Sequence, residues 1–218
     1  HHQSVYHRFR IVAVCRIVRG LPRYGRGWIF CVAKAFDSAG AMKVVVTGPE
    51  CCGKSSLAAE LAEHYGVAYL QEPARFYLKA GYVYQPSDLL AIFRKQLELE
   101  TVHNHEPLIL DTDLQTLCIW WQEKFGPLPE SLRSHYARQC AVVDRLYLLC
   151  RPDLPWEFDA LRENPNDRER IFALYHSDLT TRKLPFVEIG GEGRERFEAA
   201  MLYLNRYPNL PNFEGPLI

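Results

Sequence analysis

The sequence predicts an α/β fold in which helices cover both faces of a mainly parallel five-stranded sheet. Two observations predict it. Short apolar runs alternate along the chain with longer segments whose apolar residues recur at helical spacing. A glycine-rich turn directly follows the first apolar run and opens the first helical segment. With 218 residues, 48% of them hydrophobic, the chain is long enough for one such domain with a sizeable core.

The expected elements alternate in order along the chain. Strands are expected at residues 44–47, 67–70, 108–110, 146–149 and 186–189. Helices are expected at residues 54–65, 87–103, 112–125, 132–140, 166–182 and 192–207, with Gly66 ending the first and Ser87 capping the second. Because helices separate the strands, the strands should lie parallel between two helical layers.

Residues 1–41 differ from the rest of the chain. They hold seven of the 26 Lys and Arg residues but only one of the 26 Asp and Glu residues, and they lack a helical or strand period. Three interpretations stay open: upstream sequence translated in error before a true start at Met42, an Arg-rich targeting peptide, or a genuine basic arm. We therefore expect one domain at residues 42–218, with residues 1–41 as an extension outside it.

Composition narrows the classes of partner. Beyond residue 41 the chain holds 19 basic and 25 acidic residues, and this mildly acidic balance argues against nucleic-acid binding. No apolar run reaches the roughly 18 residues of a membrane span. The seven cysteines form no C-x-x-C pair, and their odd number and scattered positions are typical of reduced thiols in a cytoplasmic protein. We expect a small-molecule substrate, and nothing indicates the oligomeric state.

The glycine-rich turn is the strongest motif. Gly48-Pro49-Glu50-Cys51-Cys52-Gly53-Lys54-Ser55 matches G-x-x-x-x-G-K-[ST], the loop of P-loop NTPases, whose backbone N–H groups surround phosphate oxygens at a helix N-terminus. Lys54 is expected to bridge the outer phosphates and Ser55 to bind Mg²⁺. The motif predicts ATP and Mg²⁺ as cofactors. The expected nucleotide contacts are Gly48, Glu50, Cys51, Cys52, Gly53, Lys54, Ser55 and Ser56.

Three acids follow strands at the edge where open α/β sheets bind ligands. Asp111 ends an apolar strand and is expected to support the metal. Glu72, or alternatively Asp113, is expected to receive the proton of an acceptor hydroxyl. Arg75 either holds phosphate or substrate, or pairs with Glu72. For each acid the alternative is a helix cap or a surface residue.

A polar, proline-bearing stretch at residues 151–167 predicts a loop or lid. Arg162, Arg168 and Arg170 lie in or directly after it and are candidates to stabilise transferred charge, unless the loop is merely solvated. Trp156 is expected to cover a planar ligand or an apolar ledge. Gly190-Gly191-Glu192-Gly193 is either an adenine contact or a simple strand-to-helix turn.

Taken together, these motifs resemble the nicotinamide riboside kinase domain of the NadR family over about residues 42–204. The matching segments are the phosphate loop, Glu72-Pro73-Ala74-Arg75-Phe76-Tyr77, Asp88-Leu89-Leu90-Ala91-Ile92 with Gln96, Asp111-Thr112-Asp113, Tyr147-Leu148-Leu149, Pro152-Asp153-Leu154-Pro155-Trp156, and Asp159-Ala160-Leu161-Arg162 with Arg168. One departure is Cys51-Cys52, where the family usually has two serines.

The resemblance implies ATP-dependent phosphorylation of the 5′-hydroxyl of nicotinamide riboside to nicotinamide mononucleotide. It implies catalytic roles for Lys54, Glu72, Asp111, Asp113, Arg162 and Arg168, and substrate contacts for Glu72, Arg75, Tyr77, Trp156 and Asp159. The nucleotidyltransferase and DNA-binding domains of bifunctional members are not expected here. Two alternatives stay open: another nucleoside or small-molecule kinase, and a nucleotide-binding regulatory ATPase without an acceptor.

Overall fold

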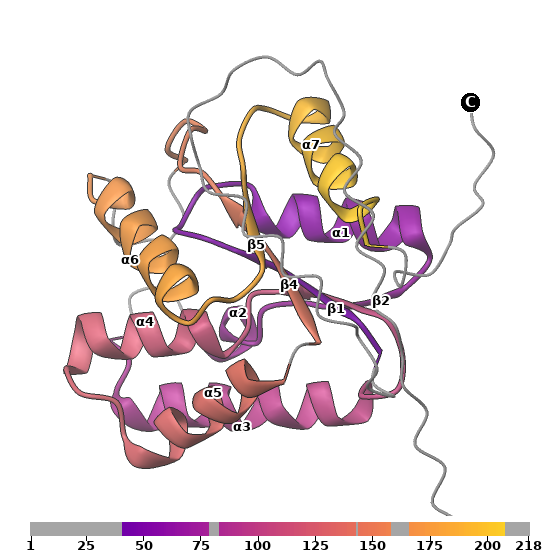
Figure 1. Cartoon of the computed structure of the whole chain (residues 1–218). Helices are drawn as coiled ribbons and strands as arrows, with labels where there is room; N and C mark the ends of the chain where they lie inside the picture. The colour runs from indigo at the N-terminus through magenta and orange to yellow at the C-terminus, as the bar shows by residue number, and fades with distance from the viewer. Residues whose placement is uncertain (1–40, 79–82, 143, 158–165, 208–218) are drawn as a thin grey trace, which may run out of the picture. The chain divides into compact units, whose positions relative to one another are not determined.

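The computed structural model describes residues 41–78, 83–142, 144–157 and 166–207. Five strands form one parallel sheet in the order β2-β3-β1-β4-β5 (Figure 1). They are β1 (Lys43–Thr47), β2 (Ala68–Leu70), β3 (Leu108–Asp111), β4 (Arg145–Cys150) and β5 (Phe186–Ile189). The helices are α1 (Lys54–Tyr65), α2 (Ala74–Tyr77), α3 (Pro86–Val102), α4 (Leu114–Phe125), α5 (Glu130–Ala141), α6 (Arg168–Thr181) and α7 (Arg194–Leu204). The predicted α/β fold class is confirmed.

The central strand β1 shows why the sequence forms this sheet. All five of its residues are buried, as expected for a parallel strand covered on both faces. Because side chains alternate along a strand, Val44 and Val46 pack into one core cluster and Val45 into another. β-branched valines suit this doubly buried position.

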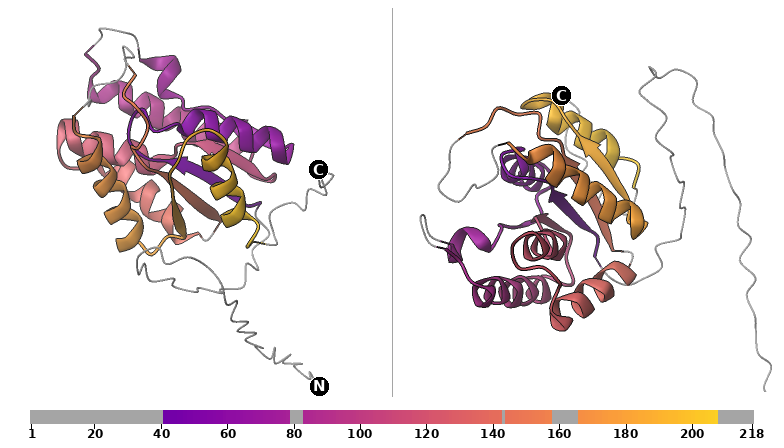
Figure 2. Two further views of the ribbon diagram at one scale, coloured as in Figure 1. Left: turned by 90° about the horizontal axis from the view of Figure 1, so that it is seen from above. Right: turned by 90° about the vertical axis from the view of Figure 1, so that its left-hand side faces the viewer.

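The two core clusters define the helical layers. On the face of Val44 and Val46 lie apolar side chains of α1 and α7, among them Leu61 and Leu204. On the face of Val45 lie those of α4 and α6, including Ile119 and Tyr175. Figures 1 and 2 show α1 and α7 together on one side of the sheet, and α3 to α6 on the other. A third apolar cluster fills the space among α2, α3, α4 and α5.

Two details differ from the sequence prediction. The helix expected to be capped by Ser87 begins one residue earlier, at Pro86, and the Asp88 carboxylate accepts a hydrogen bond from the Gln85 backbone N–H at 2.7 Å. Proline suits the first helical position because that position needs no N–H donor. The short helix α2 was not predicted, since four residues are too few to show a helical period.

The strand order places β1 at the point where successive connections turn to opposite sides of the sheet. β3 lies on one side of β1 and β4 on the other, so the loop after β1 emerges between the ends of both neighbours. Ligands of open α/β sheets bind at such a crevice. No helix in the described part of the chain is long and apolar enough to cross a membrane.

Candidate functional site

The phosphate loop joins β1 to α1 in a backbone shape that requires its glycines. Gly48 has φ 135° and Gly53 has φ 73°, values that side-chain-bearing residues rarely adopt. A Cβ at Gly48 would lie 2.6 Å from the carbonyl oxygen of Cys150, and one at Gly53 would lie 3.0 Å from Leu154 Cδ1. Gly48 is therefore fixed by close approach to backbone as well as by conformation, and Gly53 mainly by its positive φ.

Lys54 opens α1 and turns back over the loop. Its Nζ donates to the Pro49 carbonyl at 2.5 Å and lies 3.8 Å from Cys52 Sγ. Burial alone would lower the pKa of Lys54, but Cys52, Glu72 and other neighbouring groups outweigh it and raise that pKa above its ordinary value. The ammonium is thus a permanent cation at the loop, suited to phosphate oxygens.

The loop lines a cavity of about 260 Å³ together with side chains from four helices. Every residue expected to contact the nucleotide is among its walls: Gly48, Glu50, Cys51, Cys52, Gly53, Lys54, Ser55 and Ser56. Glu72 and Arg75 join them from the β2–α2 region, Thr116 and Trp120 from α4, and Tyr175 from α6. The cavity therefore brings the loop together with the predicted acceptor-binding acid.

Glu72, which lines this cavity, is the acid predicted to receive the proton of the acceptor hydroxyl. Burial raises its pKa to about 7, the charge of Lys54 opposes that rise, and the charge of Asp111 adds to it. Arg75 lies 3.8 Å from Glu72 (Nε to Oε2) and donates to Ser55 Oγ at 3.1 Å. A carboxyl group with a pKa near neutrality can exchange a proton with a substrate hydroxyl at working pH.

Asp111 ends β3 and is 1% exposed. Neither of its carboxylate oxygens has a hydrogen-bond partner among the described residues. Burial and, second, the charge of Asp111 raise the pKa of Tyr69 to about 12. A buried carboxylate without a partner is costly unless something else binds it, and Mg²⁺ accepts such oxygen ligands.

These residues fit Mg²⁺ bound with a nucleotide. Asp111 could supply a carboxylate oxygen, and Ser55, at the start of α1, a hydroxyl oxygen. The described residues contain no group of three or more His, Cys, Asp or Glu that could hold a metal alone.

Asp113 lies apart from this cavity, and the expectation that it receives an acceptor hydroxyl is corrected. It is the N-cap of α4 and accepts from the Gln115 backbone N–H at 2.9 Å. Its other oxygen accepts from Tyr147 Oη at 2.8 Å and from Gln139 Nε2 at 2.7 Å. Burial raises its pKa to about 6, opposed by Arg145. Its oxygens are thus engaged in the core.

Residues 154–157 lie against the phosphate loop, as does Arg168 at the start of α6. Arg168 Nη1 donates to the carbonyls of Leu154, at 2.8 Å, and Cys51, at 3.2 Å. The Glu157 backbone N–H lies 3.1 Å from Cys51 Sγ, and the Trp156 ring lies 5.8 Å from the Arg168 guanidinium carbon. Arg168 therefore fastens this segment to the loop.

The remaining predicted residues are distributed as follows. Asp159 and Arg162 lie outside the described residues. Tyr77, at the end of α2, is 45% exposed. Neither Tyr77 nor Trp156 lines the phosphate-loop cavity or the smaller cavity described below. Arg170 pairs with Glu123 and Asp167 on the surface.

Sequence reasoning missed Arg196 on α7. This guanidinium is 3% exposed, donates to the carbonyls of Cys52 at 2.7 Å and Gly191 at 2.9 Å, and pairs with Asp153. Asp153 in turn accepts from the Gly191 backbone N–H at 2.8 Å, so Gly190–Gly193 forms a fastened turn between β5 and α7. Arg196 shares a helix stripe with Ala200 and Leu204, and a cation on a buried stripe was the available signal.

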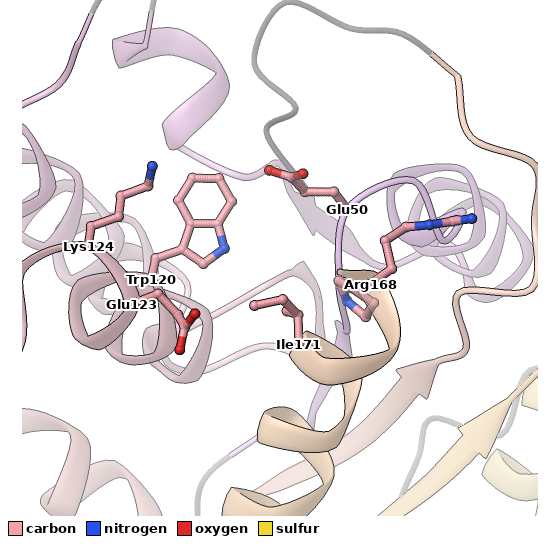
Figure 3. A pocket seen from close by; sticks show the side chains of 7 residues that line it. Glu50, Trp120, Glu123, Lys124, Arg168 and Ile171 are labelled. Atoms are coloured by element: carbon pink, nitrogen blue, oxygen red, sulfur yellow. The ribbon is translucent and has the colours of Figure 1, made fainter. Parts of the chain in front are cut away.

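A second cavity, of about 190 Å³, adjoins the first and shares Glu50 and Trp120 with it (Figure 3). Its other walls are Pro49, Glu123, Lys124, Arg168 and Ile171. Neither Trp120 nor this cavity was predicted as part of the site, because the sequence pattern of α4 did not separate Trp120 from its buried neighbour Trp121.

Comparison with known proteins agrees with this geometry. A family model, AAA_28, described as an AAA domain, matches residues 43–196. No curated protein matches the chain.

Several solved structures share the fold. A NadR protein in complex with NR has a TM-score of 0.61 and 20% identity, covering 77% of this chain and 51% of that one. Thymidylate kinase from Candida albicans has a TM-score of 0.55 and 14% identity, covering 79% and 95%. Deoxyadenosine kinase from M. mycoides has a TM-score of 0.51 and 15% identity, covering 76% and 100%. This chain thus spans about half of the NadR chain, and at these identities the likeness concerns the fold.

Proposed function

The chain belongs to this family of AAA domains, and from that premise we propose that it is an ATP-dependent kinase of a nucleoside, nicotinamide riboside, whose 5′-hydroxyl it phosphorylates to nicotinamide mononucleotide. One observation carries the proposal. A phosphate loop and a carboxyl group with a pKa of about 7 line the same cavity. A carboxyl group in this position can accept the proton of an acceptor hydroxyl during phosphoryl transfer.

The proposed mechanism assigns a role to each group. The loop amides and Lys54 hold the ATP phosphates and oppose the charge that develops in transfer. Ser55 and Asp111 would hold Mg²⁺, which neutralises phosphate charge when it is bound. Glu72 orients the acceptor hydroxyl and takes its proton.

We propose that residues 154–157 and Arg168 help to exclude water from the phosphates. Arg168 is already fastened to the loop through Cys51 and Leu154, and we propose that Arg162 joins it to stabilise the transferred group. Exclusion of water favours transfer to the nucleoside over hydrolysis of ATP. Arg75, which lines the phosphate-loop cavity, is proposed to support substrate binding.

A panel of nucleosides with ATP and Mg²⁺, with products identified by mass, tests the proposal. We expect turnover with nicotinamide riboside. Turnover only with another nucleoside would support a different kinase on the same scaffold. Tight nucleotide binding with no acceptor phosphorylated would support a regulatory ATPase and contradict the kinase proposal.

A further inference from the structure

The second cavity has the size and walls of a site for one ring. Its volume of about 190 Å³ is below the roughly 300–1,000 Å³ of sites that enclose a whole drug-sized ligand. Trp120, Ile171 and Pro49 give it apolar walls, and Figure 3 shows the Trp120 indole between α4 and the phosphate loop. Since Trp120 also lines the phosphate-loop cavity, a ligand bound here would extend into that cavity.

Trp120 and Trp121 have different roles. Trp121 is 7% exposed within a core cluster, and its Nε1 donates to the Pro127 carbonyl at 3.0 Å. Trp120 is half-buried and lies nearly parallel to Tyr84, with ring centroids 6.4 Å apart and an interplanar angle of 17°. The Trp120 indole N–H has no hydrogen-bond partner among the described residues, and in Figure 3 it points into the cavity. Tyr84 thus braces a ring that offers an apolar surface and one donor.

The charges around the indole favour a particular kind of ring. Figure 3 shows the Glu50 carboxylate directed toward Trp120 and the Arg168 side chain directed away from it. Arg168 is committed to the carbonyls of Cys51 and Leu154, and Lys124 Nζ lies 4.3 Å from the centre of the Tyr84 ring. A ring that carries hydrogen-bond donors or a positive charge would suit this arrangement better than an anionic one.

We propose that the Trp120 cavity binds the planar heteroaromatic ring of the acceptor nucleoside, with the indole N–H donating to a ring carbonyl or carboxamide oxygen. The ribose would then reach past Trp120 to Glu72. This inference rests on the proposed kinase function. The cationic pyridinium and carboxamide of nicotinamide riboside meet all three requirements, which are flatness, an acceptor oxygen and no negative charge.

Calorimetric titration of nicotinamide riboside in the presence of Mg²⁺ and a non-hydrolysable ATP analogue tests the proposal. Trp120→Ala should weaken nicotinamide riboside binding by about 5- to 150-fold, the range seen when an aromatic platform for one base is removed. Trp120→Phe should recover part of that loss because it keeps the ring surface but lacks the N–H donor. Affinity for the ATP analogue should stay within about twofold.

Phe125→Ala is the matched control. Phe125 is a half-buried aromatic residue on the same helix, packs against the same core cluster and lines neither cavity. Its removal should leave nucleoside affinity unchanged, so a general loosening of α4 would be recognised by equal losses in Phe125→Ala and Trp120→Ala. Equal losses would overturn the proposal.

Three further results would also overturn it: unchanged nicotinamide riboside affinity in Trp120→Ala, loss of affinity for the ATP analogue instead, or no binding of nicotinamide riboside to the native chain. Turnover is measured separately. Nucleoside binding that depends on Trp120 without phosphoryl transfer would support the ring site and contradict the kinase proposal. A rate of phosphoryl transfer that Trp120→Ala leaves unchanged would support the kinase proposal and contradict the ring site.

Discussion

At the scale of single residues, the phosphate-loop cavity depends on groups whose ionisation is set by burial. Burial raises the pKa of Glu72 to about 7, whereas the charges around Lys54 raise its pKa despite burial. The pair therefore combines a permanent cation with an acid that changes charge near neutral pH. Phosphoryl transfer to a hydroxyl needs both.

Glu72 should control the acidic side of the pH profile. If Glu72 takes the hydroxyl proton, kcat/KM should rise as pH increases through about 7, because only the carboxylate can accept that proton. Glu72→Gln should lower kcat by about 100-fold or more and remove this limb, with little change in ATP affinity. Steady-state kinetics between pH 5 and 9, bracketing the pKa of about 7, measure it. If kcat/KM of Glu72→Gln still rises through about pH 7, Glu72 is not the group that accepts the hydroxyl proton.

The same pKa shift has a stability consequence of defined sign. The folded protein holds the Glu72 proton more tightly than the unfolded chain, whose pKa is near the ordinary 4.5. The contribution of Glu72 to the free energy of unfolding should therefore decrease as pH rises from about 4.5 to about 7. Glu72→Gln should flatten that decrease in urea titrations, and an unchanged pH slope would contradict it.

Asp111 should couple magnesium to turnover. Asp111→Asn removes a buried negative charge without a hydrogen-bond partner, so the free energy of unfolding without Mg²⁺ should stay equal or rise. The Mg²⁺ concentration for half-maximal turnover should increase about tenfold or more. Asp88→Asn, at the distant start of α3, is the control. Equal Mg²⁺ dependence in native and Asp111→Asn protein would exclude Asp111 from the metal site.

At the scale of elements, α7 and the β5–α7 turn support the phosphate loop from outside the cavity. Arg196 joins the carbonyls of Cys52 and Gly191 and pairs with Asp153, so three separate segments meet at one guanidinium. The conformation of the phosphate loop is thereby stabilised by contacts with α7. The phosphate-loop motif alone gives no hint of this support.

Arg196→Ala should therefore weaken nucleotide binding indirectly, because Arg196 supports the phosphate loop through the Cys52 carbonyl. We expect a loss of about 2 kcal/mol or more in the free energy of unfolding, because charge-assisted hydrogen bonds of a buried guanidinium are lost. ATP affinity should fall as well. Arg194→Ala is the matched control, since Arg194 pairs with Glu198 on the exposed side of the same helix. Similar losses in the two variants, by thermal unfolding and calorimetry, would argue against this role.

Individual elements show what the sequence could predict. The consecutive valines of β1 and the glycines of the loop have strong local signals, since burial on both faces and positive φ each restrict residue choice. Asp113 misled because an acid after a strand can equally be the cap of the following helix. Trp120 and Arg196 could not be assigned from sequence because their roles depend on contacts between distant segments.

At the scale of the whole molecule, the extent of the domain, residues 42–218, stays a prediction. β1 begins at Lys43, and the matched region covers residues 43–196. The parallel sheet of this part of the chain has its centre at β1, so Lys43 and the residues after it are part of the core.

A chain that begins at Met42 should therefore fold and turn over like the full chain. Met42 is 7% exposed in the core cluster beside β1, so the shorter chain keeps this core residue. Thermal unfolding and kcat should agree between the two chains. A loss of cooperative unfolding in the shorter chain would show that residues 1–41 are part of the folded domain.

Labelled ATP tests directly whether the chain transfers the γ-phosphoryl group to nicotinamide riboside. The native chain and Lys54→Ala would be incubated with nicotinamide riboside, Mg²⁺ and ATP labelled in the γ-phosphoryl group. We predict labelled nicotinamide mononucleotide, phosphorylated at the 5′-oxygen, from the native chain, and a rate at least about 100-fold lower from Lys54→Ala. Label that remains in ATP or appears only as inorganic phosphate would contradict the proposed transfer to the nucleoside.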